Sequence, residues 1–553
     1  MTVSCICGPS IWGDHMKDDN IAVQGASGVS YWVRLASMTA LEDQGHLVAK
    51  AGRRQLALFL RDDKIYACNN RCPHEGYPLS EGHLASGCIL TCNWHNWKFD
   101  LSSGETLVGG DELTVYETRL DGDDIYVEIV EPSTADVTEK ALRGLRLGFD
   151  RHEYDRMARE IARLMHVGAD PLDAVRKTIE WTYESFEYGT THAVAATADW
   201  LALAANEEAG SPKRLTAILE SVGHFAWDSR REPRYPFADE SNPYDADQLV
   251  KAIGSEDEGT AAKLVRGAFD AGLRYADIEP ALTRAALAHY QDFGHALIYV
   301  YKTGQLIARL KDRGTELQLV LMMVRSLIYA SREDLIPEFK AYAPALENWD
   351  GKGDEVPTLE NLTGGRQAQI LEAISSGSAE TGQTFDALMQ AAGWQLLHYD
   401  MKYQEQTDKP VSQNTTWLSF THALTFGNAV RHLCGRYPDL WPQGLLQLGC
   451  FLGRNAAFVD PEIDETDWLV ADPTAFLHES MEGLYDHGNP EFIVSSHLVK
   501  ILTALADDVS ECGSSPALPM MLAGVNRFLN SPLKRKHALR TAHQALTLVA
   551  LES

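Results

Sequence analysis

The chain has 553 residues, of which 45% are hydrophobic and 23% charged, and its formal net charge is −29. This composition is that of a globular protein, and the length allows about three domains. The acidity argues against a nucleic-acid-binding surface, which needs Lys and Arg to neutralise phosphates. No apolar stretch is long enough to span a membrane, and the first twenty residues lack the apolar core of a signal peptide. We therefore expect a cytoplasmic protein, whose nine cysteines form no disulfide framework.

Short runs of alternating apolar residues mark the N-terminal part of the chain. After an expected N-terminal extension at residues 1–29, the pattern predicts a small antiparallel β domain at residues 30–131. A linker is expected at residues 131–136, where Pro and Ser interrupt the pattern. The strands of this β domain are expected at residues 55–60, 65–68, 113–118 and 125–129.

The rest of the chain has the periodicity of helices. Apolar residues recur at spacings of three and four, and Pro and Gly gather between the periodic segments. The sequence thus predicts a large all-α domain at residues 137–553, so the expected protein is a small β domain followed by an all-α domain. Its clearest helical segments are residues 172–183, 192–205, 282–310, 317–330, 421–433 and 492–505.

Two Cys and His pairs lie in the predicted β domain: Cys72 and His74 are followed, after seventeen residues, by Cys92 and His95. A Rieske centre needs one Cys and one His from each of two loops, because one iron takes two thiolates and the other takes two imidazoles. The flanking residues 71–79 and 91–105 resemble Rieske ferredoxins and Rieske oxygenase components. The motif therefore predicts a [2Fe-2S] cluster held by Cys72, His74, Cys92 and His95.

The same four residues could also form a zinc site, but both Cys-to-His spacings fit zinc fingers and ribbons poorly. Cys68 and Cys88 each lie four residues before a ligand cysteine, and we predict that both are small buried strand residues. High-potential Rieske proteins have a further cysteine pair after the ligands, and those positions hold other residues here. The resemblance thus implies a cluster of lower potential that supplies electrons.

A Rieske cluster transfers one electron at a time, so a large fused domain is expected to contain the electron acceptor. Ring-hydroxylating oxygenases bind their iron through an Asp and two closely spaced His, and residues 137–553 lack this signature. A di-iron carboxylate bundle needs two Glu-x-x-His motifs, and the nearest approach is the single segment from Asp292 to His295. Both kinds of iron site are therefore disfavoured.

Four histidines occur within apolar helical segments of the predicted α domain. His192, His295 and His422 each precede an alanine, and small neighbours allow helices to approach closely. On a helix, His497 falls on the apolar face and Lys500 lies one turn away at its edge, where a lysine usually extends to water. Each histidine alone fits a hydrogen-bonded core position. Four of them beside an electron donor favour an iron site.

Four short blocks of the helical region resemble the questin oxidase-like family, non-heme iron oxygenases that open or cleave the rings of aromatic polyketides. The family's iron is thought to be bound by four histidines and a carboxylated lysine. The resemblance therefore implies a mononuclear iron bound by His192, His295, His422, His497 and Lys500, with His224, His289 and His398 in reserve. The blocks, which occur in the family's order, are residues 188–201, 293–301, 417–425 and 496–505.

These inferences predict a Rieske-coupled non-heme iron oxygenase. NAD(P)H-derived electrons would pass from a separate reductase or ferredoxin to the cluster, and then to the iron, which activates O₂ against an organic substrate, aromatic or polycyclic by resemblance. The fused Rieske domain departs from the family and implies a need for external electrons. We expect the protein to bind neither nucleic acid nor a membrane. A homo-oligomer could bring one subunit's cluster near its neighbour's iron. Tyr188, Tyr299 and Tyr301 lie close to the predicted ligands in sequence, and each fits a core position equally well.

Two alternatives differ in what the helical domain contains. In the first, the chain is an electron-transfer protein whose helical domain docks a partner and binds no metal. In the second, the helical domain binds haem through one axial histidine.

Overall fold

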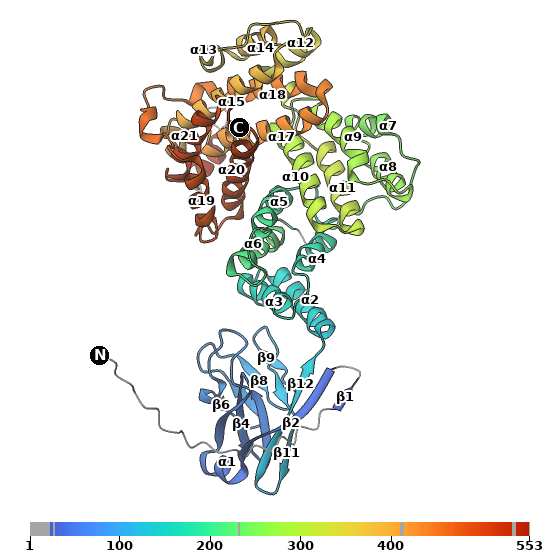
Figure 1. The fold of residues 1–553 in the computed structure, drawn as a ribbon, viewed down its shortest axis with the longest axis vertical. Helices are drawn as coiled ribbons and strands as arrows, with labels where there is room; N and C mark the ends of the chain where they lie inside the picture. The colour runs from blue at the N-terminus through green and yellow to red at the C-terminus, as the bar shows by residue number, and fades with distance from the viewer. Residues whose placement is uncertain (1–22, 26–27, 230–232, 410–413, 534–537, 552–553) are drawn as a thin grey trace, which may run out of the picture. The chain divides into compact units, whose positions relative to one another are not determined.

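The computed structural model describes residues 23–25, 28–229, 233–409, 414–533 and 538–551. Contacts divide the chain into two compact units, Met1–Gly144 and Leu145–Ser553. The expected extension at residues 1–29 lies almost entirely outside the described residues. The prediction of a small antiparallel β domain followed by a large helical region is confirmed (Figure 1).

Antiparallel strands build the N-terminal unit, together with one short helix, α1 (Met38–Gln44). Among the described residues they form three four-stranded sheets, ordered β1-β2-β12-β11, β10-β5-β4-β3 and β6-β7-β8-β9. The strands are β1 Val23–Gly25, β2 Gly28–Ser37, β3 His46–Ala51, β4 Arg54–Arg61, β5 Lys64–Asn69, β6 His83–Leu84, β7 Ile89–Thr91, β8 Lys98–Asp100, β9 Thr106–Val108, β10 Val115–Tyr116, β11 Thr118–Asp121 and β12 Asp124–Pro132.

Strand β4 joins two hydrophobic cores because successive side chains of a strand point to opposite faces. Leu56 and Leu58 enter one core with residues of β12, and Ala57 and Phe59 enter the other. The second core also contains the predicted ligands Cys72 and Cys92, together with residues from the sheet β6–β9. The loops that carry these cysteines are thus fixed by apolar packing.

Two details of the N-terminal unit differ from the sequence prediction. The strand expected at 113–118 is divided between β10, which pairs with β5, and β11, which pairs with β12. The linker expected at 131–136 is almost absent, because β12 runs to Pro132 and α2 begins at Thr134. Ser133 caps this helix start, since its hydroxyl accepts a hydrogen bond from the backbone N–H of Asp136.

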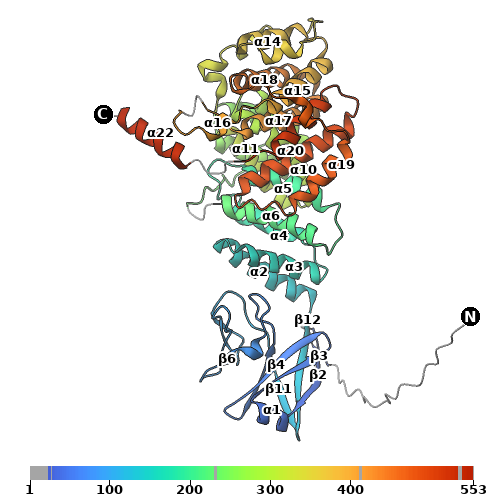
Figure 2. The same cartoon turned by 90° about the vertical axis from the view of Figure 1, so that its left-hand side faces the viewer.

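Helices α5, α10, α17 and α20 lie at the centre of the helical unit in both views (Figures 1 and 2), and they pack against one another. The described α-helices after the β domain are α2 Thr134–Arg151, α3 Tyr154–His166, α4 Leu172–Thr182, α5 His192–Ala204, α6 Pro212–Asp228, α7 Ala246–Gly254, α8 Glu258–Asp270, α9 Tyr275–Leu287, α10 His295–Leu310, α11 Arg313–Ile328, α12 Tyr342–Glu347, α13 Leu359–Thr363, α14 Gln367–Ser376, α15 Thr381–Leu397, α16 Lys402–Glu405, α17 Trp417–Arg436, α18 Trp441–Asn455, α19 Pro473–Leu484, α20 Phe492–Glu511, α21 Leu518–Leu529 and α22 Ala538–Leu551.

The helical segment expected at 282–310 is wrong in one respect, because it is two helices and not one. Helix α9 ends at Leu287 and α10 begins at His295. Between them Asp292, Phe293 and Gly294 all have positive φ, at 52°, 43° and 79°. Apolar periodicity continues across this break, so spacing alone could not reveal it. The break makes His295 the first residue of a helix.

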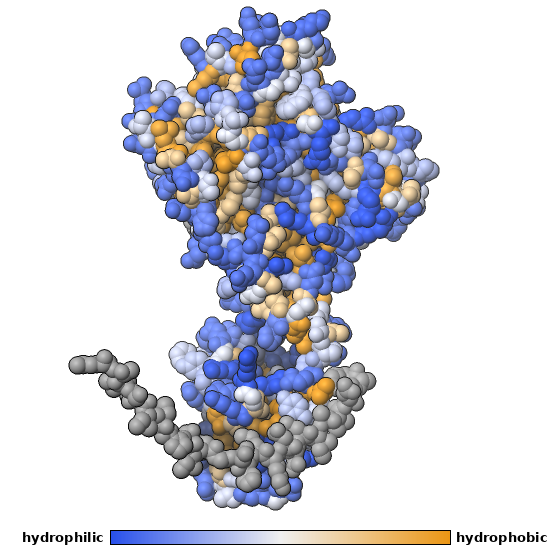
Figure 3. Space-filling view, viewed as in Figure 1, coloured by the Kyte–Doolittle hydropathy of each residue, from blue (hydrophilic) through white to orange (hydrophobic). Residues whose placement is uncertain are grey.

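No helix among the described residues is long and apolar enough to cross a bilayer. On the face of the helical unit seen in Figure 3, hydrophilic residues predominate and hydrophobic residues are scattered between them. The apolar residues of the central helices are instead buried, as Val194, Ile298 and Val499 illustrate with no exposed surface.

Helices α15 and α21 approach so closely that two glycines are required. A Cβ atom at Gly393 would lie 2.7 Å from the backbone nitrogen of Met521, and one at Gly524 would lie 2.6 Å from the Gly393 carbonyl oxygen. Backbone atoms of a helix cannot move to relieve such a contact, whereas a flexible side chain can change its rotamer. The packing of α15 on α21 therefore depends on Gly393 and Gly524.

We expect Gly393→Ala to lower the free energy of unfolding by about 1–3 kcal/mol, because the added methyl group overpacks the helix contact. Gly382→Ala is the matched control, since Gly382 is in the same helix and has open space around it. That change should be neutral or stabilising by up to about 1 kcal/mol, through alanine's helix propensity. Urea denaturation followed by circular dichroism measures both, and equal losses would contradict the packing argument.

Candidate metal centres

The two Cys-His loops of the N-terminal unit have the same backbone structure. The N–H of Cys72 donates to the Tyr77 carbonyl at 2.8 Å, and the Gly76 N–H donates back to the Cys72 carbonyl at 2.8 Å. In the second loop the N–H of Cys92 donates to Trp97, and Asn96 donates to Cys92, at 2.8 and 3.0 Å. Gly76 and Asn96 both have positive φ, which glycine and asparagine tolerate best. Each loop thus presents one Cys and one His in a fixed turn.

The side chains of these loops converge. The rings of His74 and His95 are 4.5 Å apart, and Trp97 stacks on His74 at 4.7 Å. His74 Nδ1 is buried and has no hydrogen-bond partner, which fits a nitrogen that binds metal. Burial also raises the pKa of the Cys72 thiol to about 11, and the neighbouring Cys92 contributes. A thiol in that position ionises readily only when a metal replaces its proton.

The two other cysteines of the unit differ in their location and burial. Cys68 is a buried residue of β5, as predicted. The prediction that Cys88 is a strand residue is wrong, because Cys88 lies in the turn before β7 with φ of 60° and is only partly buried. Both are free thiols.

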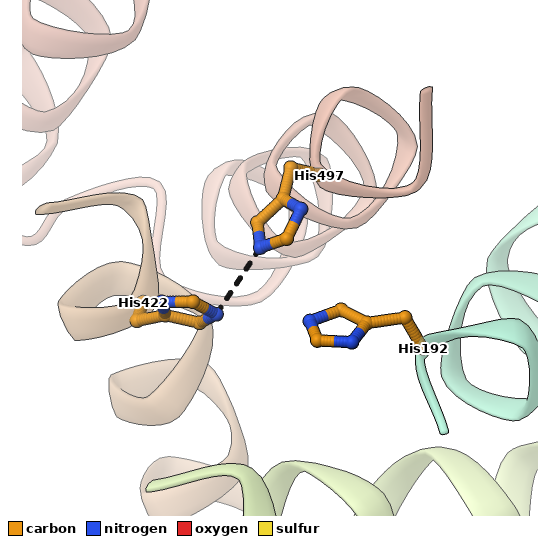
Figure 4. Close-up of side chains that lie close together, drawn as sticks. All are labelled: His192, His422 and His497. Atoms are coloured by element: carbon orange, nitrogen blue, oxygen red, sulfur yellow. Dashed lines mark hydrogen bonds between the residues drawn. The ribbon is translucent and has the colours of Figure 1, made fainter. Parts of the chain in front are cut away.

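In the helical unit, the four predicted histidines come together from the four central helices. His192 and His295 are the first residues of α5 and α10, while His422 and His497 lie within α17 and α20. Figure 4 shows His192, His422 and His497 pointing toward one another from three helices. A nitrogen atom from each of these three lies within 4.8 Å of the other two.

The ring nitrogens of this histidine cluster (His192, His295, His422 and His497) face each other in pairs. The Nε2 atoms of His192 and His295 are 3.1 Å apart, and those of His422 and His497 are 3.2 Å apart. Two imidazoles bound to one ion at about 2.1 Å, with roughly 90–110° between them, would place their nitrogens about 3.0–3.4 Å apart. The spacing of the cluster therefore fits a shared metal ion.

Backbone carbonyls set the orientation of the rings. Nδ1 of His295 is 2.6 Å from the Asp292 carbonyl oxygen, and Nδ1 of His497 is 2.6 Å from that of Ile493. A carbonyl oxygen only accepts, so each Nδ1 carries the proton and each Nε2 keeps its lone pair. These lone pairs face His192 and His422 at 3.1 and 3.2 Å, and each facing ring can either donate an N–H to its partner or share a metal ion with it.

Burial disfavours protonation of these rings. Desolvation, followed by the Lys500 ammonium, lowers the pKa of His295 to about 4 and holds those of His192 and His497 well below their usual value. The pKa of His422 is lowered first by burial and then by His295, His497 and Lys500. The histidines are therefore neutral near pH 7, which is the form that binds metals.

Lys500 differs from the sequence prediction, which placed it at the edge of the apolar face. It is buried, with 1% of its surface exposed, and its Nζ atom has no hydrogen-bond partner. Desolvation lowers the pKa of its amine to about 7, and Asp199 opposes this while Lys302 reinforces it. Since Lys500 follows His497 by three residues on α20, both side chains lie on one side of the helix.

A buried ion pair that the sequence analysis missed lies near Lys500. Lys302 Nζ is 2.6 Å from Asp199 Oδ1, and the Thr503 hydroxyl donates to the same oxygen at 2.7 Å. The second carboxylate oxygen of Asp199 is buried without a partner. Asp199 could have been noticed as the only charged residue in the apolar run of α5. Its partner Lys302 is 103 residues away, so the pairing itself was not visible.

Of the three tyrosines considered in the sequence, one lies at the histidine cluster. The Tyr299 hydroxyl is 3.4 Å from His192 Nδ1. Tyr301 instead stacks on His432 at 4.6 Å, and Tyr188 is 61% exposed.

The reserve histidines have other partners. His289 lies 3.2 Å from Asp334, and His398 lies 3.1 Å from Glu465. His224 stacks on Phe492 and lies 3.4 Å from Asp228. None of the three belongs to the group of converging nitrogens found among the described residues.

Comparisons with known proteins agree with the N-terminal geometry. Residues 31–115 match the Rieske [2Fe-2S] domain family. The chain is similar to the "3-phenylpropionate/cinnamic acid dioxygenase ferredoxin subunit" of Shigella boydii serotype 4 (strain Sb227) and of Escherichia coli (strain K12), at 35% identity over 78 residues in each case. These matches cover 14% of this chain and 74% of each relative. A similar solved structure, the ferredoxin of carbazole 1,9a-dioxygenase from Nocardioides aromaticivorans IC177, is 23% identical and covers 17% of this chain and 95% of its own, with a TM-score of 0.17.

Gly294 permits the sharp turn that places His295. Its φ is 79°, and a Cβ atom there would lie 2.7 Å from Phe426 and 2.9 Å from Phe451. Gly272 has a similar φ of 86° but open space around it. Substituting Gly272 therefore tests the effect of backbone strain without the close contact.

We expect Gly294→Ala to displace His295 and to lower the metal content of the helical unit, whereas Gly272→Ala should leave it unchanged. Both variants should lose about 1 kcal/mol of stability through the strained φ. Metal analysis of the purified variants, alongside their thermal unfolding, measures the two effects separately. Equal metal content in both variants would contradict a role for Gly294 in placing His295.

Proposed function

Because the chain belongs to the Rieske [2Fe-2S] domain family through residues 31–115, we propose that it is a Rieske-coupled non-heme iron oxygenase. In this proposal Cys72, His74, Cys92 and His95 hold the cluster. The helical unit binds one iron through the histidine cluster and Lys500, and an organic substrate is oxidised there with O₂.

The observation that carries the proposal is the pairwise approach of imidazole Nε2 atoms at 3.1 and 3.2 Å. A buried core histidine normally gives its second nitrogen a donor or an acceptor of its own. Here the Nε2 lone pairs of His295 and His497 are directed at two other imidazoles, and one divalent metal ion would bind all four rings together. Imidazole suits zinc, copper, nickel and iron alike, and the presence of a Rieske domain in the same chain favours a metal with redox chemistry.

Lys500 would complete the set of ligands. Reaction of its neutral amine with CO₂ forms a carbamate and releases a proton, which turns the side chain into an anionic oxygen donor. Three features of this structure support such an anion: a buried Nζ without a partner, four neutral imidazoles, and the N-termini of α5 and α10, which favour negative charge.

Iron bound at this site would supply activation of O₂ with electrons from the cluster. The protein's own residues have simpler tasks. The Tyr299 hydroxyl, 3.4 Å from His192 Nδ1, orients that ring and can hold a proton beside it. Apolar residues of α5, α10, α17 and α20 surround the site, in which His497 is buried and His192, His295 and His422 are partly exposed.

The resemblance to the questin oxidase-like family supports an aromatic or polycyclic substrate. The electrons would originate from NAD(P)H and arrive through a separate reductase or ferredoxin. The family's iron enzymes are not expected to need a fused Rieske domain. The reaction of this chain would therefore differ from one in which the substrate supplies every electron.

A second candidate function is electron transfer alone, with a helical unit that docks a partner and binds no metal. It is favoured by the family match, which ends at residue 115, and by relatives that are named as ferredoxin subunits. The two functions differ in the iron content of the helical unit.

Iron and acid-labile sulfide per chain distinguish them. The oxygenase proposal gives about three irons and two sulfides after anaerobic Fe(II) reconstitution, since a Rieske cluster accounts for two of each. The variant His295→Ala/His497→Ala should lose one iron and keep both sulfides. The control His289→Ala/His398→Ala removes two histidines outside the cluster and should keep all three irons. Two irons in every protein would favour the electron-transfer function.

A further inference from the structure

A cavity of about 480 Å³ opens between α3, α6 and the start of α20. This volume lies within the range of small-molecule sites. Aromatic side chains form much of its wall, including Trp227, whose ring is on the rim and 61% exposed. Phe492 lies between Trp227 and Tyr154, at 6.3 and 6.4 Å from their rings. The cavity is therefore suited to a ligand with a flat apolar body.

Glu220 places a buried carboxylate in this cavity. It is 4% exposed and accepts hydrogen bonds from the Tyr154 hydroxyl at 2.8 Å and from the Ser495 hydroxyl at 3.1 Å. His487 Nε2 is 3.2 Å away, and His487 Nδ1 accepts from the Asn489 backbone N–H at 2.9 Å. Because Nδ1 is an acceptor, Nε2 carries the proton and the ring is neutral. The donors to Glu220 are thus uncharged, and its negative charge is not cancelled.

The remaining polar groups of the cavity also favour a ligand that donates hydrogen bonds. The side-chain oxygen of Asn489 is buried without a partner, so it can accept one more hydrogen bond. Asp486 adds a second carboxylate, and no Lys or Arg is present among the described residues that line the cavity. Such a lining disfavours carboxylates and phosphates. It favours an ammonium group, which both carboxylates and aromatic faces attract.

The cavity lies close to the histidine cluster. Phe492 precedes His497 by five residues on α20, a rise of about 7.5 Å along the helix axis. On its other side Phe492 stacks on His224, at 5.4 Å and an interplanar angle of 13°. His224 lies 3.4 Å from Asp228, whose carboxylate accepts a hydrogen bond at 2.8 Å from Thr191, the residue before His192. The side chains of Phe492, His224 and Asp228 thus connect the cavity with the cluster.

We propose that this cavity binds an organic amine, with its ammonium group at Glu220 and its ring against Trp227 and Phe492. The amine is then the substrate class of the enzyme, and that part of the inference rests on the proposed function. Binding itself requires only the cavity, so it can be tested whether or not iron is present.

The test uses three naphthalene probes of one size on the full chain, measured by isothermal titration calorimetry: 1-naphthylmethylamine, 1-naphthalenemethanol and 1-naphthoate. We expect the amine to bind most tightly and the carboxylate to show no binding. Glu220→Gln should weaken amine binding at least about tenfold, because it removes a charge-assisted contact. Trp227→Ala should weaken it about threefold or more.

The matched control is Tyr188→Ala, since Tyr188 is also 61% exposed but does not line the cavity. It should leave amine binding unchanged. Equal affinity for the alcohol and the amine, tighter binding of the carboxylate, or an unaltered affinity in Glu220→Gln would overturn the proposal. Iron content per chain, measured on the same samples, separates this outcome from failure of the proposed function. If a chain with only two irons binds the amine, the result supports the amine site and contradicts the oxygenase proposal.

Discussion

The helical unit depends on one constraint: four imidazole rings must share a small space with their Nε2 atoms facing one another in pairs. Backbone carbonyls of Asp292 and Ile493 hold the protons on the outer nitrogens of His295 and His497. The Nε2 lone pairs of His295 and His497 then face His192 and His422 at 3.1 and 3.2 Å. Each contact needs either an N–H on the facing ring or a metal ion between the two nitrogens. Burial disfavours the charged form of these rings. In our proposal a metal ion lies between them, which would account for the convergence of four helices on this point.

Charge around the histidine cluster is balanced by residues that do not touch it directly. Lys500 is buried without a partner, and Lys302 is paired with Asp199 through a 2.6 Å contact. If Lys500 were a cation, it would oppose a metal ion held by the histidines. A carbamate at the same position would attract one. In the proposed metal site Lys500 would therefore be a carbamate; burial and Lys302 lower the pKa of its amine, whereas Asp199 raises it.

Much of this structure could be predicted from the sequence because the informative features are local. The two Cys-His loops have short, fixed spacings, and each forms one turn closed by its own backbone, with Gly76 and Asn96 at the left-handed position. The apolar periodicity predicted most of the helical segments and placed His497 on a buried helix face.

Features that depend on distant parts of the chain could not be predicted. The break before His295 requires Gly294 to fit against Phe426 and Phe451, which belong to other helices. The depth of Lys500 depends on how α20 packs, and the partner of Asp199 comes from a helix 103 residues later. The cavity at Glu220 joins α3, α6 and α20, so no single segment carries a signal for it.

If electrons from the Rieske cluster are used at the histidine cluster, the iron in the helical unit should control how fast O₂ reoxidises the chemically reduced [2Fe-2S] cluster. Stopped-flow absorbance measures this rate. We expect rapid reoxidation in the iron-loaded protein and slow reoxidation in His295→Ala/His497→Ala, which keeps the four cluster ligands. Equal rates in the two proteins would show that the helical unit takes no electrons.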